Sequence, residues 1–461
     1  MKTLKVTLKQ HTPLIHFQHD QYGATLRSSE VKPKLDRFIL TKLGGGNYEH
    51  GKEVAKNNGW LIGNKNALNY KMSIVPYEKK EISLKEKEDN KDDKNVWVTE
   101  TFPMILSNMG GKENQADLVN LSLYNHVVMT LIIWEDSLEK EMRDNIPVFF
   151  ANTNFGQRHT KGFGSFTAYK FNDEKPIKWN ESNYYKSGCP YMAFALENEN
   201  KLTEEQKQEK NKLTEKQKQE KLFAVLDFYW KCLKAGVNYT KGEIKGENAN
   251  HYIKSFLYVF LNKYRNETWE KRTIKQTFHL GKERGKIVEN PNQSIFARGF
   301  LGCPDKYADR SKEVKVEHGV PNDDEHKIKR IPAPIYFKPI CFGNKCYIYL
   351  LFDIAVTSSF ISIPRDKRVF KFSNNGKSIE LEMKPFIGSK NYMPFIDEFH
   401  EYLSENSDVL KALYTEKSRD SYKDFYGEKL QDDVWGFVPK DFKWKDILMD
   451  ENCVIFNNVK P

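Results

Sequence analysis

Apolar and polar residues alternate at the start of the chain. Residues 3–8 (TLKVTL) put apolar side chains on one face and polar side chains on the other. This pattern predicts a half-buried strand that continues through residues 13–17. Alternation or a β-branched run predicts three further strands, over residues 66–76, 126–134 and 166–169.

Two helices are expected between these strands. The first begins near residues 30–33, with Pro33 in its first turn, and stops before the glycines at 44–46. The second follows Ser137, its predicted N-cap, and Pro147 is expected to kink or split it. The resulting order, β-α-β-β-α-β, is the ferredoxin-like arrangement and places the chain in the α+β class.

The remainder of the chain contains a tandem repeat and a second set of elements. Residues 201–211 (KLTEEQKQEKN) and 212–222 (KLTEKQKQEKL) repeat almost unchanged and predict a solvated helix inserted in a loop, with a partner-binding coil as the alternative. Helices are predicted over residues 222–233, 251–265 and 395–413, and a hairpin over residues 334–340 and 345–353. We therefore expect a first domain at 1–175, a linker with the charged repeat at 176–221, and a second, diverged domain at 222–461.

Composition excludes several classes of protein. Hydrophobic residues are 39% of the 461 and aromatic residues 13%, which is enough to fill sizeable cores and excludes global disorder. No apolar run reaches about 18 residues, so no transmembrane helix is expected. The N-terminal residues lack the apolar core of a signal peptide, and we expect a cytoplasmic protein.

Charge and cysteine content add two expectations. The 73 Lys and Arg against 63 Asp and Glu give a net charge of +10, which suits nucleic acid but also a lysine-rich solvated surface. The cysteines are scattered without a C-x-x-C pair: Cys189, Cys232, Cys303, Cys341, Cys346 and Cys453. We expect free thiols in a reducing compartment, no zinc or other metal site, and no cofactor.

Two basic segments are the candidates for chemistry. Residues 156–164 (GQRHTKGFG) combine three glycines with Arg158, His159 and Lys161, so that free backbone N–H groups beside cations suit a phosphate. A plain glycine-rich turn is the alternative. The loop into the first helix clusters basic residues at a helix N-terminus, where N–H groups are unpaired: Arg27, Lys32, Lys34 and Arg37. Its alternative is a capped helix with a solvated basic face.

These two segments, in this order, resemble the RAMP (repeat-associated mysterious protein) superfamily of CRISPR effector subunits. Residues 26–37 (LRSSEVKPKLDR) are similar to its L-R-x-S-x-[LIV]-K-x-x-[LI]-R entry to the first helix, with Pro33 replacing the usual glycine and a looser spacing to the last arginine. Residues 155–166 (FGQRHTKGFGSF) resemble its F-G-x-x-x-R-[RK]-G-x-G-[SR] loop, with Lys161 at the basic position.

The second half is more weakly similar to the large Cmr-type subunits, which carry two RAMP domains. Residues 298–304 (RGFLGCP) resemble R-x-x-L-G-L-P, and residues 330–339 (RIPAPIYFKP) resemble R-x-x-S-P-[IL], with Ala333 in place of the usual serine. The likeness covers residues 1–170, and 290–355 more loosely. It implies two ferredoxin-like (RRM-like) βαββαβ domains with helical insertions.

The resemblance implies a non-catalytic RNA-binding subunit of a type III CRISPR ribonucleoprotein. Its partners would be guide RNA, target RNA and other RAMP subunits, with no membrane. Basic loops, glycines and many aromatic residues also suit single-stranded RNA. The expected RNA-binding residues are Arg27, Ser28, Lys32, Lys34, Arg37, Gly156, Arg158, His159, Lys161, Gly162, Gly164, Arg330 and Lys338.

An endoribonuclease is the alternative. RNA cleavage needs a base for the 2′-OH and an acid for the leaving 5′-oxygen, or a metal with carboxylates. His16, His19 and Asp20 lie in one loop beside the expected RNA groove, and RAMP subunits that cut target RNA carry an aspartate upstream of the first-helix motif. Asp20 is the comparable residue here, and His159 is placed to assist it.

Overall fold

The computed structural model describes most of the chain, with gaps. The described residues are 1–15, 25–63, 65–80, 85–88, 96–99, 121–177, 191–195, 214–239, 251–265, 267–280, 294–302, 306–309, 312–318, 333–342, 345–387 and 393–405. They form an α+β fold, as the sequence predicts, with sheets that are antiparallel except where β11 (Ser294–Ile295) pairs in parallel with β10 (Thr268–Trp269) and β17 (Lys377–Glu382). Among them, no helix combines the length and the apolar character needed to cross a membrane.

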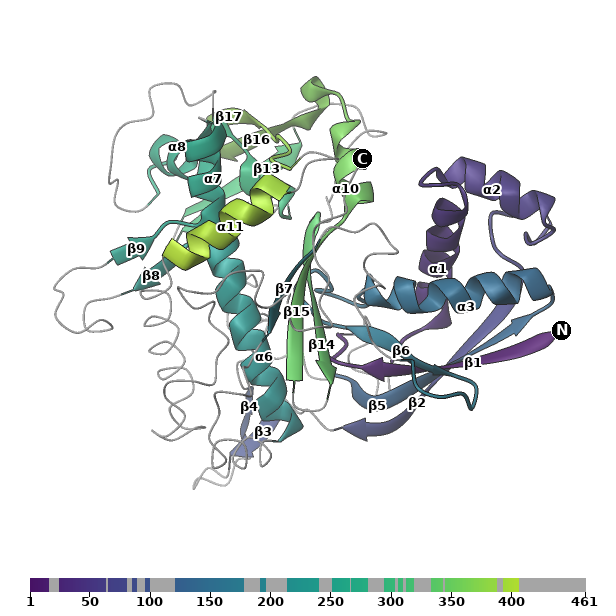
Figure 1. Ribbon diagram of the computed structural model, residues 1–461. Helices are drawn as coiled ribbons and strands as arrows, with labels where there is room; N and C mark the ends of the chain where they lie inside the picture. Colours follow the sequence, from purple (N-terminus) through teal and green to yellow (C-terminus); the bar gives the residue numbers. More distant parts are fainter. Residues whose placement is uncertain are drawn as a thin grey trace.

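A four-stranded antiparallel sheet forms the first half (Figure 1). Its strands lie in the order β2-β5-β1-β6, where β1 is Lys2–Gln10, β2 Tyr70–Lys80, β5 Leu123–Ile133 and β6 Phe166–Phe171. The helices are α1 (Ser28–Leu43), α2 (Tyr48–Asn57) and α3 (Asp136–Ala151). Along the chain, the strands of this sheet and the two main helices follow in the order β1, α1, β2, β5, α3 and β6, with α2 after α1 and two further short strands described between β2 and β5.

Side-chain alternation explains why α1 and α3 lie on one face of this sheet. Leu4, Val6 and Leu8 of β1 are buried and share a core with Ile39 of α1 and Met142 of α3. The residues between them on β1 point to the opposite face, because successive side chains of a strand alternate. The first half therefore has one apolar and one more polar sheet face.

Both helices of the first half differ in detail from the expectation. Helix α1 begins at Ser28, so Pro33 lies beyond its first turn. Helix α3 continues through Pro147 without a break. Ser137 is not its cap: the N-cap is Glu135, and the Ser137 hydroxyl accepts a hydrogen bond from Trp60 Nε1 at 2.9 Å. The Ser137 hydroxyl, which the local sequence pattern assigned to the N-terminus of α3, is thus bonded to a residue that is distant in the sequence.

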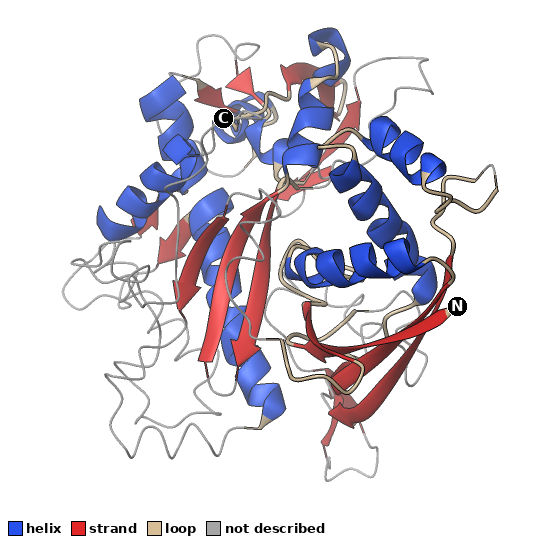
Figure 2. Ribbon diagram, turned by 45° about the vertical axis from the view of Figure 1, so that its right-hand side comes forward, coloured by secondary structure: helices blue, strands red, loops and turns tan. Residues whose placement is uncertain are grey.

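The second half contains two larger sheets (Figure 2). One has the order β14-β15-β7, where β14 is Ile335–Phe342, β15 Lys345–Phe352 and β7 Tyr191–Ala195. The other has the order β10-β11-β17-β16-β13-β12, with bounds Thr268–Trp269, Ser294–Ile295, Lys377–Glu382, Val369–Asn374, Lys312–His318 and Lys306–Asp309. The described strands of this half do not form a second four-stranded sheet of the first type.

Helices and short ladders complete the described chain. The helices are α6 (Glu215–Trp230), a π-helical turn (Lys231–Ala235), α7 (Phe256–Arg265), α8 (Glu270–Thr277), α9 (Ala297–Phe300), α10 (Ile354–Ile361), a 3₁₀ turn (Arg365–Arg368) and α11 (Met393–Glu405). Two-stranded ladders pair β3 (Lys85–Glu88) with β4 (Val96–Thr99), and β8 (Val237–Tyr239) with β9 (His251–Ile253). Part of the second 11-residue repeat lies in α6, whereas the first repeat, 201–211, lies outside the described residues.

The hairpin β14–β15 corrects the expectation of free thiols. Its register places Cys341 directly opposite Cys346, and the structure joins them in a disulfide with a Cα–Cα distance of 4.1 Å. The two cysteines are five residues apart in the sequence, without the C-x-x-C spacing, so the sequence pattern did not reveal this pairing. Cys232 is buried as a free thiol, and Cys189, Cys303 and Cys453 lie outside the described residues.

The two halves share a hydrophobic core. The large cluster of the second half also contains Ile15, Leu121, Leu123 and Phe163 from the first half. Helix α6 spans the predicted domain boundary at 221–222 and carries Phe223, which stacks on Phe163 with ring centroids 4.0 Å apart. The glycine-rich loop that holds Phe163 is therefore part of the joint between the halves.

Candidate nucleic-acid interface

The two basic segments singled out in the sequence touch each other. The backbone N–H of Gly156 donates to Oε1 of Glu30 on α1 at 2.9 Å, and the same oxygen accepts from Lys34 Nζ at 2.9 Å. Lys34 Nζ also lies 5.0 Å from the centre of the Phe155 ring. Residues 26–37 and 156–164 are therefore in direct contact, and the carboxylate of Glu30 is the connection that the sequence pattern did not reveal.

A separate pocket of about 710 Å³ lies on another side of α1. Its lining includes Ser28, Lys32, Asp36, Arg37, Tyr48 and Tyr70, with no residue of the glycine-rich loop. Residues 30 and 34 lie one turn apart on the side of α1 that meets the loop. The predicted residues of α1 are thus divided between two surfaces rather than lining one cleft.

Lys32 is held by the interior of the first half. Its Nζ lies 3.0 Å from Oδ2 of buried Asp36, donates to the Leu68 carbonyl at 2.8 Å, and sits 3.6 Å from the centre of the Tyr70 ring. Burial raises the pKa of Asp36, and burial likewise lowers the pKa of Lys32, each opposed by their mutual attraction. Lys32 therefore fixes α1 against the start of β2.

Asp36 receives two further hydrogen bonds. The Tyr70 hydroxyl donates to Oδ1 at 2.8 Å, and the backbone N–H of Leu68 donates to Oδ2 at 3.2 Å. Burial, with the negative charge of Asp36 beside it, raises the pKa of Tyr70 well above its usual value, so the phenol stays a donor. The acidic group thus stabilises the pocket wall by pairing donors that would otherwise be buried without a partner.

The glycine-rich loop is not an open row of N–H groups. The N–H groups of Gln157 and Gly164 donate to the carbonyls of Ile15 and Pro13, and those of Lys161 and Gly162 bond within the loop. With Gly156 bound to Glu30, these donors are occupied by protein. The expectation of a continuous run of free N–H groups along the loop is therefore corrected.

Packing explains the glycines of this loop. Gly164 has φ +65°, and a Cβ there would lie 2.0 Å from the Phe155 carbonyl oxygen. At Gly162, with φ +92°, a Cβ would lie 2.9 Å from Leu226 of α6 and 3.1 Å from Pro339 of β14. Gly156, with φ +76°, approaches the Ile15 carbonyl in the same way. All three glycines therefore allow the loop to pack closely against neighbouring segments of the same chain.

The cations of the loop differ in exposure. Arg158 is half-buried with φ +53°, and burial lowers its pKa. His159 is exposed, and its Nδ1 lies 3.2 Å from the Gly156 carbonyl. Lys161 is only 7% exposed; burial, followed by the charge of Arg158, lowers its pKa to about 8. On α1, Arg27 and Arg37 are exposed, and the Arg37 guanidinium lies 5.8 Å from the Tyr48 ring centre.

Lys338 occupies the interior rather than a surface. It is fully buried on β14, and its Nζ donates to the carbonyls of Thr153 and Phe166, each at 2.9 Å. Burial lowers its pKa well below the usual value. This position favours a structural role, in which Lys338 ties β14 to both ends of the glycine-rich loop.

Several predicted residues lie outside the described part of the chain. These are Arg330 and the candidate catalytic residues His16, His19 and Asp20. Of the residues proposed for catalysis, only the assisting His159 has a described position.

Polar residues that flank the glycine-rich loop bind it to β14. Asn154 Nδ2 donates to the Phe337 carbonyl at 2.7 Å, and the Phe337 N–H donates to the Thr160 carbonyl at 3.1 Å. The Ser165 hydroxyl donates to the Pro339 carbonyl at 2.6 Å. These contacts were missed in the sequence, where the loop was interpreted as a basic, glycine-rich segment that suits a phosphate.

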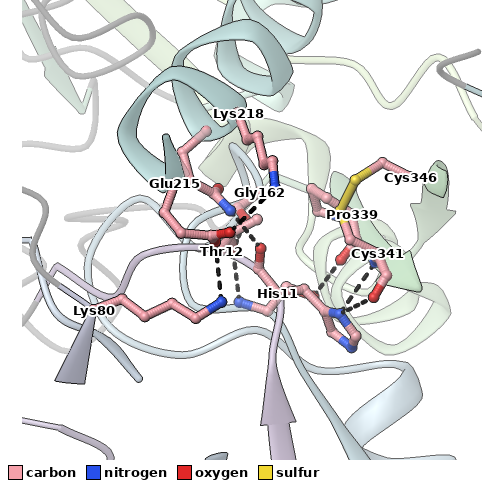
Figure 3. The surroundings of a disulfide bond; sticks show 11 residues. His11, Thr12, Lys80, Gly162, Glu215, Lys218, Pro339, Cys341 and Cys346 are labelled. Carbon is pink, nitrogen blue, oxygen red and sulfur yellow. Dashed lines mark hydrogen bonds and ion pairs between the residues drawn. A yellow bond between two sulfur atoms is a disulfide. The ribbon is translucent and has the colours of Figure 1, made fainter. Parts of the chain in front are cut away.

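The end of β1 completes this joint (Figure 3). The Thr12 hydroxyl donates to the Gly162 carbonyl at 2.7 Å, and His11 Nδ1 lies 3.1 Å from the backbone N of Cys341. His11 Nε2 lies 2.7 Å from Thr167 Oγ1, and burial lowers the His11 pKa well below its usual value. A neutral His11 therefore links the disulfide-bearing hairpin to the first sheet.

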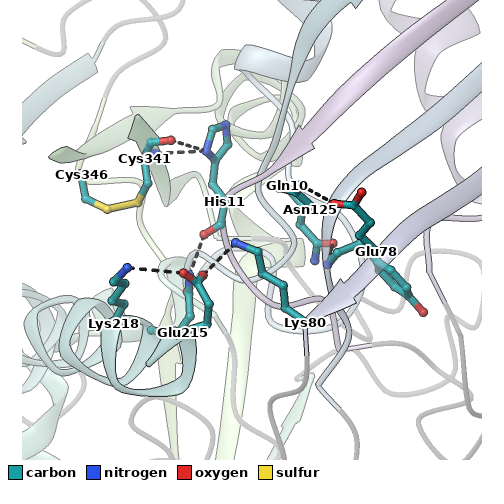
Figure 4. A network of polar contacts seen from close by, with 11 residues as sticks. Gln10, His11, Glu78, Lys80, Asn125, Glu215, Lys218, Cys341 and Cys346 are labelled. Atoms are coloured by element: carbon teal, nitrogen blue, oxygen red, sulfur yellow. Dashed lines mark hydrogen bonds and ion pairs between the residues drawn. A yellow bond between two sulfur atoms is a disulfide. The ribbon is translucent and has the colours of Figure 1, made fainter. Parts of the chain in front are cut away.

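Helix α6 meets the same region through its first turns (Figure 4). Lys80 Nζ of β2 lies 3.1 Å from Oε2 of Glu215, and Gln219 Nε2 donates to the His11 carbonyl at 3.0 Å. The charged repeat that the sequence assigned to solvent thus contributes, through Gln219, a buried hydrogen bond between the halves.

Family models match most of the chain. The model of the Cmr1 N-terminal domain matches residues 1–237, and the model of the Cmr1 C-terminal domain matches residues 252–417. Among curated proteins, none matches the sequence.

Three solved structures are similar at low identity. The crystal structure of apo Cmr1 from Pyrococcus furiosus matches 88% of this chain and 97% of its own, with 12% identity and a TM-score of 0.37. A chain of type III-B Cmr-beta bound to cognate target RNA and AMPPnP, in the presence of ssDNA, matches 86% and 98%, with 12% identity and a TM-score of 0.32. In type III-B Cmr-beta bound to cognate target RNA, the match covers 37% of this chain and 59% of that chain, with 10% identity and a TM-score of 0.22.

The family models support the resemblance that was first seen in residues 26–37 and 155–166. They match the chain as far as residue 417, including the second half, where the sequence motifs were weaker. The resemblance to the Cmr-type RAMP subunits is confirmed, and the chain belongs to the Cmr1 family.

Proposed function

We propose that this chain is a non-catalytic RNA-binding subunit of a Cmr-type CRISPR ribonucleoprotein, and that it holds guide or target RNA at the junction of α1 and the glycine-rich loop. The observation that carries the proposal is the bond from the Gly156 N–H to Glu30. It places Lys34 of one motif beside the loop that carries Arg158 and His159, and Arg27 precedes Glu30 by one helical turn.

The chemistry of the junction suits a polynucleotide backbone. Arg27 is exposed, and Arg158 keeps part of its surface in solvent. Guanidinium groups bind phosphate oxygens in a bidentate geometry, and fixed positions reduce the entropy lost on binding. Lys161 is buried close enough to Arg158 for the two charges to interact, so its charge adds to the local potential. Lys32 and Lys338 hold α1 and the glycine-rich loop in position.

Charge reversal tests this proposal. Arg27→Glu and Arg158→Glu are each expected to weaken binding of a fluorescein-labelled single-stranded RNA by about tenfold or more, because each removes a phosphate contact and adds repulsion. Lys56→Glu, at an exposed position near the end of α2, is the matched control with the same charge change. Fluorescence anisotropy gives the dissociation constants; equal affinities for all three variants would refute the assignment.

The non-catalytic part has its own test. We expect labelled target RNA to stay intact when it is incubated with the chain, with or without Mg²⁺, and Asp20→Ala to make no difference. Cleavage by the unmodified chain that Asp20→Ala abolishes would instead establish the endoribonuclease.

A further inference from the structure

The first sheet has an open face. Helices α1 and α3 lie on one face, and in both ribbon views the opposite face carries no described helix (Figure 1, Figure 2). Among the described residues, the start of α6 approaches one end of this face, where Glu215 pairs with Lys80, and the β14–β15 hairpin approaches it at β6, where His11 connects Cys341 to Thr167. The outward positions of the four strands thus form a surface that is distinct from the α1 and glycine-loop junction.

An exposed aromatic pair lies on this face. Tyr77 of β2 is opposite His126 of β5 in the ladder, and their rings stack with centroids 5.2 Å apart and planes within 9°. Tyr77 is 46% exposed, and Val75, the next outward residue of β2, is 48% exposed. Stacking holds the two rings in nearly parallel planes, so the exposed part of Tyr77 has a fixed orientation.

A bulge adds a third ring at the far edge of the sheet. In β6, Lys170 pairs with Thr7 and Ala168 pairs with Leu8, which leaves Tyr169 as an extra residue. A bulge of this kind turns neighbouring side chains to the same side. Tyr169 is 43% exposed. Three strand spacings, about 14 Å, separate β2 from β6, so the rings lie at opposite edges of the face.

The strands of this sheet are strongly basic. Their lysines are Lys2, Lys5, Lys9, Lys71, Lys79, Lys80 and Lys170, and their one acidic residue is Glu78. Lys5 and Lys71 are exposed at outward positions of β1 and β2, in alternation with buried Leu4 and Tyr70. Glu78 accepts a hydrogen bond from Asn125 Nδ2 at 2.8 Å, at the end of the ladder.

We propose that this open sheet face is a second binding surface for single-stranded RNA, on which bases stack against Tyr77 and His126 while Lys5 and Lys71 contact phosphates. The proposal rests on the proposed function and adds a surface to it. Aromatic rings on a basic sheet suit unstacked bases, because every base has a π-face. A protein partner fits less well, since lysine is depleted in the buried parts of protein interfaces.

The experiment uses the full chain and a fluorescein-labelled oligouridine of about 16 nucleotides. Tyr77→Ala is expected to weaken binding about tenfold, which is the size of one lost base stack, whereas Tyr77→Phe keeps the ring and stays within about twofold. Lys5→Ala is compared with Lys56→Ala, and only the first is expected to weaken binding. Because these positions are exposed, folding should be preserved, and circular dichroism checks it.

Photo-crosslinking gives a readout that a structural role would not produce. Oligouridine carrying 4-thiouridine is expected to crosslink to the peptides that contain Tyr77 or His126. No crosslink there, together with unchanged affinity of Tyr77→Ala and Lys5→Ala, would overturn the sheet-face proposal.

The same measurements separate the two proposals. If Arg158→Glu weakens binding and the sheet variants do not, the junction stands and the sheet face is wrong. If the sheet variants weaken binding and Arg27→Glu and Arg158→Glu do not, the sheet face stands and the junction is wrong. If the unmodified chain does not bind the RNA, both are wrong.

Discussion

At the scale of single residues, Lys161 shows how the joint between the halves affects a side chain of the RAMP motif. It lies within the glycine-rich loop, forms a β-bridge with Phe337 of β14, and is 7% exposed. With a pKa of about 8, Lys161 is protonated in most molecules at pH 7. The fold therefore buries a positive charge there, which lowers its stability. Lys161 thus reports on how tightly β14 covers the loop.

The lowered pKa predicts a pH-dependent stability. Between pH 8 and 10.5 the unfolded chain binds a proton at Lys161 that the folded chain has released, so stability rises with pH in this window. The free energy of unfolding should increase by roughly 3 kcal/mol more than in Lys161→Met. Urea unfolding at a series of pH values measures the difference; parallel profiles for the two proteins would contradict the buried position.

The sequence predicted the basic residues of the candidate site but not the contacts that each of them makes. Spacing placed Lys32 near a helix N-terminus, yet Asp36, Leu68 and Tyr70 are what hold it. The hydrogen bonds from Lys338 to Thr153 and Phe166 join segments more than 170 residues apart. Local sequence patterns carry no information on such partners. Whether a lysine is buried and bonded or exposed to solvent is therefore decided by the tertiary fold.

At the scale of elements, the glycine-rich loop is a packed connector between α3 and β6. Gly164 and Gly45 have nearly the same backbone angle, φ +65° and φ +62°. Only Gly164 has a neighbour, the Phe155 carbonyl oxygen, within van der Waals range of an added Cβ. Comparing substitutions at Gly45 and Gly164 therefore separates the free-energy cost of the backbone angle from the cost of the close contact.

Alanine substitution at these two glycines should therefore have unequal effects. Gly45→Ala is expected to lower the free energy of unfolding by about 1 kcal/mol, because only the left-handed backbone angle is unfavourable for alanine there. Gly164→Ala must also displace the Phe155 backbone, and we expect a loss of about 3 kcal/mol or more. The loss of stability is measured from urea denaturation midpoints. Equal losses for the two variants would show that the loop backbone accommodates the added methyl group at little cost in free energy.

The sequence predicted the elements of the first half better than those of the second. Strong alternation and β-branched runs located all four strands of the first sheet and both of its main helices. In the second half, β10 and β11 are two-residue strands, too short to leave a periodic pattern. Their pairing with β17 depends on contacts that span much of the chain.

At the scale of the whole molecule, the halves are joined through Phe163. It belongs to the loop of the first half but lies in the core of the second, stacked on Phe223 of α6. Phe150 of α3 is equally buried but lies in the core of the first half. These two phenylalanines report separately on the two cores.

Phe163→Ala and Phe150→Ala should each reduce the free energy of unfolding by about 3–5 kcal/mol, because each leaves a cavity. Their local effects should differ. Amide hydrogen exchange is expected to accelerate in α6 for Phe163→Ala and in α3 and β5 for Phe150→Ala. Identical exchange patterns would mean that the chain opens only as a single unit.

The central claim is that the α1 and glycine-loop junction grips RNA through its arginines. The most direct measurement is the salt dependence of RNA binding by the double variant Arg27→Ala/Arg158→Ala. Each lost phosphate contact should reduce the slope of log K against log salt by about 0.7, so we expect a slope shallower by about 1.4 than in the unmodified chain and in Lys56→Ala. The same slope and affinity in all three proteins would contradict the claim.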